Sequence, residues 1–124
     1  MQLSGVLTYG SYQYAAWYTS SRVATLARRT LPNGAWSTLQ LSHSLSTDDS
    51  HNVIALGVSP ADGVIHVAMD CHSTKLYYTK SEAGLATNGA SWTASRFGSV
   101  VNTLGTLNIG TYVQFLSLHD LDLL

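Results

Sequence analysis

The fold is decided by the stretch DSHNVIALGV, residues 49–58, and by its continuation SPADGVIHVAMDCHSTKL, residues 59–76. Apolar residues alternate along 53–58 and again along 64–69, as they do in half-buried strands. The cluster Pro60-Ala61-Asp62-Gly63 between them has the composition of a tight turn. This pattern predicts two antiparallel strands that fold back on each other.

The turn sets which residues face each other across this hairpin. A four-residue loop brings the two apolar rows together, with Val58 opposite Ile65. The same ladder, continued outward, places His51 opposite His72, with Cβ atoms roughly 5 Å apart. A two-residue loop would pair His72 with Val53 instead, at the same end of the hairpin. Either register predicts two imidazoles near one another at one end.

The composition limits the class of protein. Of 124 residues, 45% are apolar, which is enough for the core of one modest domain. The formal charge of -1 argues against a nucleic-acid or anionic-membrane partner held by charge. No apolar run approaches the ~18 residues of a membrane span, and Met1–Ser4 lacks the basic and apolar parts of a secretory signal. Cys71 is the single cysteine, so no internal disulfide is expected.

Short segments rich in Val, Tyr, Trp, Leu and Thr, broken by Gly, Ser, Asn and Asp, predict an all-β chain. They group into one four-strand meander at about 3–41 and a second at about 52–98, whose fourth strand is expected at Trp92–Phe97. A third unit is expected to begin within 111–124. Four-strand units that recur at this spacing are typical of β-propeller blades. A β-sandwich with evenly spaced hairpins is the alternative.

The number of units is small for a closed ring. Propellers close with about 4 to 8 blades, whereas residues 1–124 hold two four-stranded antiparallel blades and the start of a third. We therefore expect a fragment of a β-propeller domain, or a chain that completes itself by association. Exposed edge strands and uncovered apolar faces would promote such self-association.

A set of short motifs in a fixed order carries a resemblance to a known family. The motifs are YQYAAWY (12–18), LARR (26–29), GAW (34–36), DDSHN (48–52), DGVIHV (62–67), DCH (70–72), LYY (76–78) and SWT (91–93). They resemble the BNR repeat-containing proteins of fungi and bacteria, seven-bladed propellers that include ulvan lyase-like enzymes and enzymes acting on L-rhamnosyl-glucuronate ends of plant polysaccharides. The resemblance covers nearly the whole chain but only about the N-terminal third of the family domain. Tyr112-Val113-Gln114-Phe115 departs from the family's Tyr-Pro-basic-Phe segment.

His51 and His72 are the catalytic residues that this resemblance implies. A histidine pair in these two motifs serves the related lyases as base or acid and as a carboxylate partner. β-Elimination at a uronic acid needs a base for the C5 proton, a group that neutralises the carboxylate and a proton donor for the leaving oxygen. An imidazole, with a pKa near ~6.5, can act as base or acid. The structural alternative is that each histidine only ties a turn through a backbone hydrogen bond.

Asn52 and Arg29 are the predicted substrate-binding residues. Asn52 would orient the neighbouring histidine, and Arg29 would grip a carboxylate in bidentate fashion. For Arg29 and the arginine before it, a structural salt bridge is the alternative. His66 lies mid-strand and is expected to be packed and hydrogen-bonded. Asp48 and Asp49 are expected to be turn residues, and a role as supporting partners of the site residues is the alternative.

No metal or cofactor is expected from the sequence. His51, His66, Asp70 and His72 are of ligand types that zinc accepts. Their spacing, however, matches no closed zinc motif, and alternation along the strand turns His66 away from the others.

The sequence and the resemblance together predict a fragment of a carbohydrate-active propeller. Its reaction would be β-elimination in a uronic-acid-containing polysaccharide, at glucuronate linked to rhamnose, and we expect the chain to be inactive alone. Hydrolysis of the same linkage stays open, and a non-catalytic glycan-binding or assembling module is the alternative. The expected partner is a polysaccharide or oligosaccharide, with no nucleic acid and no membrane. An extracellular location follows from the resemblance alone.

Overall fold

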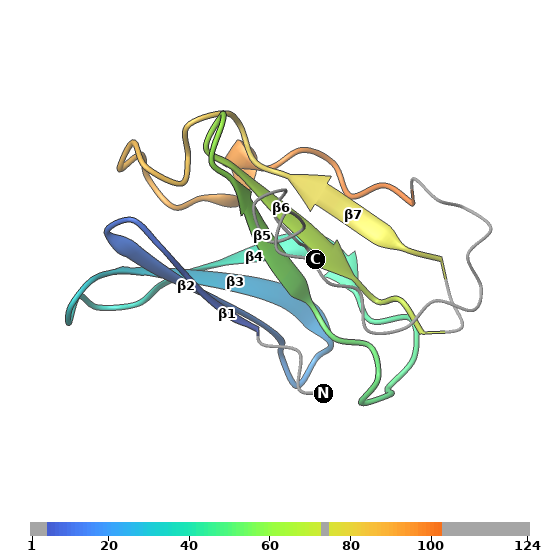
Figure 1. Cartoon of the computed structure of the whole chain (residues 1–124). Helices are drawn as coiled ribbons and strands as arrows, with labels where there is room; N and C mark the ends of the chain where they lie inside the picture. The colour runs from blue at the N-terminus through green and yellow to red at the C-terminus, as the bar shows by residue number, and fades with distance from the viewer. Residues whose placement is uncertain (1–4, 73–74, 103–124) are drawn as a thin grey trace, which may run out of the picture.

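A computed structural model describes residues 5–72 and 75–102 of the chain. The described part contains two antiparallel sheets, of four and three strands, and one short 3-10 helix (Figure 1). Within these residues no helix is long and apolar enough to cross a lipid bilayer. The all-β architecture predicted from the sequence is confirmed.

The first sheet is a simple meander in which each strand pairs with the next along the chain. The four strands follow one another as the predicted meander does, and their ends differ from the prediction by a few residues. Gly10 occupies the tight turn between the first two strands with a φ of 57°, a conformation that favours glycine. In order, the strands are β1 (Val6–Tyr9), β2 (Tyr12–Tyr18), β3 (Val23–Thr30) and β4 (Ser37–Ser44).

The second sheet is built around the predicted hairpin. Val58 lies opposite Ile65 and Leu56 opposite Val67, which is the register expected for a four-residue loop. Asp62 shapes the turn, because its Oδ1 accepts a hydrogen bond of 3.1 Å from the backbone N–H of Val64. The three strands, in sheet order, are β5 (Ala55–Ser59), β6 (Val64–Met69) and β7 (Tyr77–Lys80).

The fourth strand predicted at Trp92–Phe97 is wrong. This segment contains the 3-10 helix η1 (Ala94–Arg96) and touches the sheet only through isolated bridges, such as Ser81 with Phe97. The physical reason is that Trp92 and Phe97 are both buried and meet edge to face, with ring centroids 5.7 Å apart. Residues five apart in a strand point to opposite faces, so the chain must turn to bury both. The predicted third unit at 111–124 lies outside the described residues.

One hydrophobic core joins the two sheets. The inner strands β1 and β5 are in contact, and both sheets contribute fully buried side chains. Since β6 is buried on both faces, it acts as the centre of the second sheet. Its second face packs Ala68 against a small satellite cluster with Cys71. The largest fully buried hydrophobic side chains are Tyr14, Leu26, Ile65, Val67, Met69 and Leu85.

The segment before η1 reaches back to the first sheet through polar contacts. Tyr14 donates its hydroxyl hydrogen to the carbonyl of Ala86 over 3.0 Å, and Arg28 donates to the carbonyl of Ala90 over 2.8 Å. Burial raises the pKa of Tyr14 to about 12, so the phenol stays a neutral donor. The guanidinium of Arg28 also lies over the Trp92 ring at 5.0 Å. The salt bridge expected for Arg28 is thus replaced by a carbonyl and aromatic rings.

A buried carboxylate holds the end of β6 to the end of β4. Asp70 is completely buried and accepts three hydrogen bonds of 2.9 Å, from His43 Nε2 and from the backbone N–H and hydroxyl of Ser46. Its own backbone N–H donates to the Tyr18 hydroxyl at 3.0 Å. The backbone of Asp70 has a φ of 54°, a region that Asp and Asn tolerate better than other non-glycine residues. We call Asp70, His43 and Ser46 the carboxylate anchor.

Removing the anchoring carboxylate is expected to destabilise the fold strongly. Asp70→Ala removes the buried acceptor of three hydrogen bonds, whose donors lie on half-buried His43 and exposed Ser46, and this should cost about 1–3 kcal/mol of unfolding free energy. Asp70→Asn keeps an acceptor oxygen and tolerates the same backbone conformation, so its loss should be clearly smaller. Urea unfolding of both variants and the parent protein measures the difference. Equal stability of the parent and the Ala variant would show that the anchor is energetically neutral.

Candidate functional site

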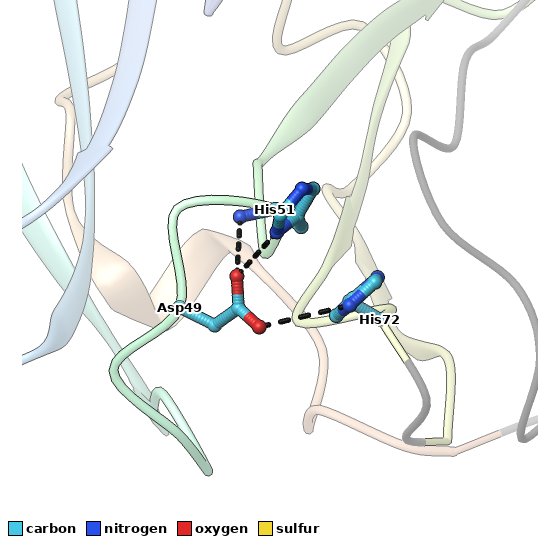
Figure 2. A group of neighbouring side chains, drawn as sticks. All are labelled: Asp49, His51 and His72. Carbon is cyan, nitrogen blue, oxygen red and sulfur yellow. Dashed lines mark hydrogen bonds and ion pairs between the residues drawn. The ribbon is translucent and has the colours of Figure 1, made fainter.

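Two histidines from separate segments meet at one end of the second sheet. His51 lies in the connection between β4 and β5, and His72 lies just after β6 (Figure 2). Their rings stack with centroids 4.6 Å apart and an interplanar angle of 20°. The juxtaposition predicted from the hairpin register is confirmed, while the catalytic role of the pair stays a prediction.

Asp49 connects the two histidines. Its Oδ1 lies 2.6 Å from Nδ1 of His51 and accepts a second hydrogen bond, of 2.9 Å, from the His51 backbone N–H. Its Oδ2 lies 3.6 Å from Nε2 of His72, on the other side of the carboxylate (Figure 2). Asp49 lies in a turn, as expected, because its carbonyl accepts a hydrogen bond from the Asn52 backbone N–H. Its contact with His72 also gives it the alternative role of a supporting partner of the site residues.

The local electrostatics keep Asp49 ionised. The hydrogen bonds from the backbone and the ring of His51, assisted by the charges of His51 and His72, hold the pKa of this carboxyl below its ordinary value. An ionised carboxylate against Nδ1 holds the ring proton there, so the lone pair of a neutral His51 sits on Nε2. The same arrangement orients the base in catalytic triads.

Asn52 supports the loop from beneath. It is only 3% exposed, its backbone N–H donates to the Asp49 carbonyl over 3.0 Å, and its amide nitrogen lies 3.4 Å from the Thr47 carbonyl. Among the described residues its Oδ1 is buried without a hydrogen-bond partner. Asn52 therefore lies next to the histidine pair, as predicted, and holds the loop that carries His51. Its substrate-binding role stays a prediction.

An open cavity of about 450 Å³ lies beside this group. Its lining includes Asp49 and Asn52 from the loop, and Trp17 from the end of β2. Trp17 is 41% exposed, which is unusual for a large aromatic side chain. An acidic group and an indole facing one hollow can contact the polar and apolar faces of a sugar ring.

Arg29, the other predicted substrate-binding residue, is not brought to this site. Arg22 lies just before β3, at the end of the first sheet next to the loop that carries His51. Its Nη2 lies 3.9 Å from Oδ2 of Asp48 in that loop. Arg29 comes seven residues further along the chain, near the opposite end of β3 and about 20 Å away at ~3.3 Å per strand residue. It donates instead to Gln13 Oε1 at 2.8 Å and lies over the Trp36 ring. Arg22, which the sequence analysis did not single out, is the arginine near the site.

The metal-ligand set considered from the sequence is not the one that the fold assembles. His66 pairs with the Tyr78 hydroxyl at 2.6 Å, and Asp70 belongs to the carboxylate anchor. In the described part of the chain, one ligand atom each from Asp49, His51 and His72 lie within 4.8 Å of one another. A metal-compatible group is therefore present, with Asp49 as its acidic member.

The fold and the comparisons with known proteins define the class. Two antiparallel meanders side by side are the arrangement of adjacent β-propeller blades. The crystal structure of polysaccharide lyase Uly1 is similar, with a TM-score of 0.71 at 23% identity over 77% of this chain and 26% of that chain. The described part of the chain therefore has the fold of part of a β-propeller.

The chain belongs to the BNR repeat-containing family, whose sequence profile matches residues 12–124. Over 78 residues it is 35% identical to the long isoform of an ulvan lyase from Alteromonas sp. (strain LOR), and equally to one from Pseudoalteromonas sp. (strain PLSV). These matches cover 55% of this chain and 8% of each relative, so the chain spans a small part of their length. The resemblance noted from the motifs is confirmed at the level of the family.

Asp49 is expected to set the tautomer of His51. Asp49→Asn replaces a charge-assisted hydrogen bond by a neutral one of about half the strength, so the proton should redistribute from Nδ1 towards Nε2. Nitrogen-15 NMR of the imidazole distinguishes the two tautomers. Asp48→Asn is the matched control, since Asp48 is exposed and makes only a 3.9 Å ion pair with Arg22. An unchanged tautomer in the Asp49 variant would refute this role.

His66 is expected to make stability fall in acid. Burial lowers the pKa of His66 below its ordinary value, so the unfolded chain binds this proton before the folded one does. The unfolding free energy should therefore decrease as the pH falls below ~6.5, the pKa of an unperturbed histidine. His66→Gln should flatten this decrease in urea unfolding measured between pH 7 and 5. An equal slope in both proteins would assign the pH dependence to other groups.

Proposed function

We propose that this chain provides part of a catalytic centre that cleaves uronic-acid-containing polysaccharide by β-elimination. The observation that carries the proposal is the stacked pair of His51 and His72, which are joined by Asp49. Asp49 also lines the open cavity, whereas neither histidine does. Family membership and the identity with ulvan lyases support it. Glucuronate linked to rhamnose is the proposed substrate.

We assign the two histidines different roles in this reaction. With its proton on Nδ1 against Asp49, His51 presents the Nε2 lone pair as the base for the C5 proton of the uronate. His72, whose Nε2 lies 3.6 Å from Asp49 Oδ2, would pair with the uronate carboxylate. As the C5–H and C4–O bonds break, a C4–C5 double bond forms. The proton taken by His51 can then pass to the departing oxygen.

The same proposal places the protein outside the cell, because that is where a polymeric substrate is met. In the described part of the chain, Arg22 is the arginine near the loop that carries His51. Its side chain is 50% exposed, and its Nη2 lies 3.9 Å from Oδ2 of Asp48. Because further substrate contacts would come from additional blades, we expect this chain to turn over little substrate alone.

A non-catalytic glycan-binding module is a second candidate, and one observation favours it. Trp17 lines the cavity and is 41% exposed, as expected of an aromatic platform for a sugar ring. In this case a uronate-containing oligosaccharide would bind with Trp17 in contact and would not be cleaved. Association through the exposed sheet edges would then build the larger binding surface.

A chimeric lyase tests the eliminative function. In it, this chain replaces the matching segment of the structurally similar lyase Uly1, and the absorbance of the unsaturated uronate product is followed. His51→Ala should lower kcat/KM at least ~100-fold, the scale of a lost general base. His72→Gln should lower kcat/KM because the uronate carboxylate loses its partner. His66→Gln is the matched histidine control and should retain the activity of the chimera.

The chain by itself completes the test. It should give little or no unsaturated product, and titration with a rhamnose–glucuronate disaccharide should shift the imidazole NMR signals of His51 and His72 but not that of His66. Turnover that survives His51→Ala would end the catalytic assignment. Binding lost in Trp17→Ala, without cleavage by the folded chimera, would favour the glycan-binding module.

A further inference from the structure

The geometry points to a zinc-binding site formed by Asp49, His51 and His72. We call these residues the zinc triad. They supply two imidazole nitrogens and one carboxylate oxygen, a set that zinc accepts in open, three-ligand sites with further positions for water. The sequence spacing gave no such motif, because Asp49 and His51 precede the first strand of the hairpin and His72 follows the second. Folding of the hairpin brings the three residues to the same end.

One ligand atom from each residue of the zinc triad lies within 4.8 Å of the other two, so the ligands must draw together around a bound ion. Zinc–nitrogen and zinc–oxygen bonds of ~2.0–2.1 Å place tetrahedral ligand atoms about 3.3 Å apart. Oδ2 of Asp49 and Nε2 of His72 are 3.6 Å apart, and Oδ1 of Asp49 and Nδ1 of His51 are 2.6 Å apart. The first pair needs to close slightly. The second has to open as the ion replaces the shared hydrogen.

The three side chains are accessible and are held by the fold. The exposed fractions of the His51, His72 and Asp49 side chains are 47%, 31% and 31%, so a hydrated ion can reach them from solvent. The loop with Asp49 and His51 is fixed by buried Asn52 below it. His72 follows Asp70, whose carboxylate holds Ser46 at the start of that loop. Pre-positioning of this kind lowers the ordering cost of binding.

Zinc in this position would act on the proposed reaction, and this part of the inference rests on the proposed function. The ion would occupy imidazole lone pairs, and one such lone pair is the proposed acceptor of the C5 proton. It would also neutralise Asp49, which orients His51. Zinc would therefore switch the centre off reversibly, and a chelator would restore it.

Zinc binding is tested on the isolated chain, without substrate. Titration calorimetry with zinc chloride should show one site per chain, and cobalt(II) in its place should give the visible absorption of a tetrahedral ion with nitrogen and oxygen ligands. His51→Ala, His72→Ala and Asp49→Asn should each weaken zinc binding more than ~10-fold. Asp48→Asn and His66→Gln are the matched controls outside the zinc triad and should bind as the parent does.

The outcomes separate a built site from surface adsorption. Loss of affinity in all three variants, with both controls unchanged, supports the site. Undiminished binding in His51→Ala or His72→Ala, or equal losses in Asp48→Asn and Asp49→Asn, would overturn it. Thermal unfolding without metal checks that each variant is folded, and His51→Gln or His72→Gln replaces an alanine variant at the same position that is not. Since no turnover is measured, this result is independent of the chimera assay.

Discussion

The whole arrangement depends on one buried carboxylate. Asp70 receives His43 and Ser46 at three hydrogen bonds of 2.9 Å, and it sits two residues before His72. A polar group buried this completely is stable only when its hydrogen-bond partners are in place. Its hydrogen bonds therefore fix where the first sheet ends, where the loop towards His51 begins and where the second strand of the hairpin stops. The site is positioned by an interaction that takes no part in its chemistry.

Local pattern was sufficient to predict the hairpin and the meeting of His51 with His72. Alternating apolar residues allow only registers that bury one face, and the turn chemistry of residues 60–63 selects among them. Such information is contained in neighbouring residues. The four-strand meander of the first sheet was predictable for the same reason, because each strand pairs with the next along the chain.

The parts that the sequence did not predict depend on packing between distant segments. The segment Trp92–Phe97 has the composition of a strand, but both of its aromatic ends enter one core, and a strand cannot bury both. Arg29 carries the right charge for a uronate, yet it lies at the opposite end of β3 from the histidines, next to Gln13. Asp49 was expected mainly to be a turn residue. Its contact with His72 exists only once the hairpin is formed.

The chemistry-bearing side chains and the anchor that positions them all come from one continuous segment, 43–72. In a ring of repeated blades, such a segment is a heritable module. Recombination that copies or exchanges one blade with its preceding linker transfers the carboxylate, both imidazoles and their shared geometry together. The proposed catalytic centre could therefore change its place around the ring in a single genetic event, while the remaining blades diverge.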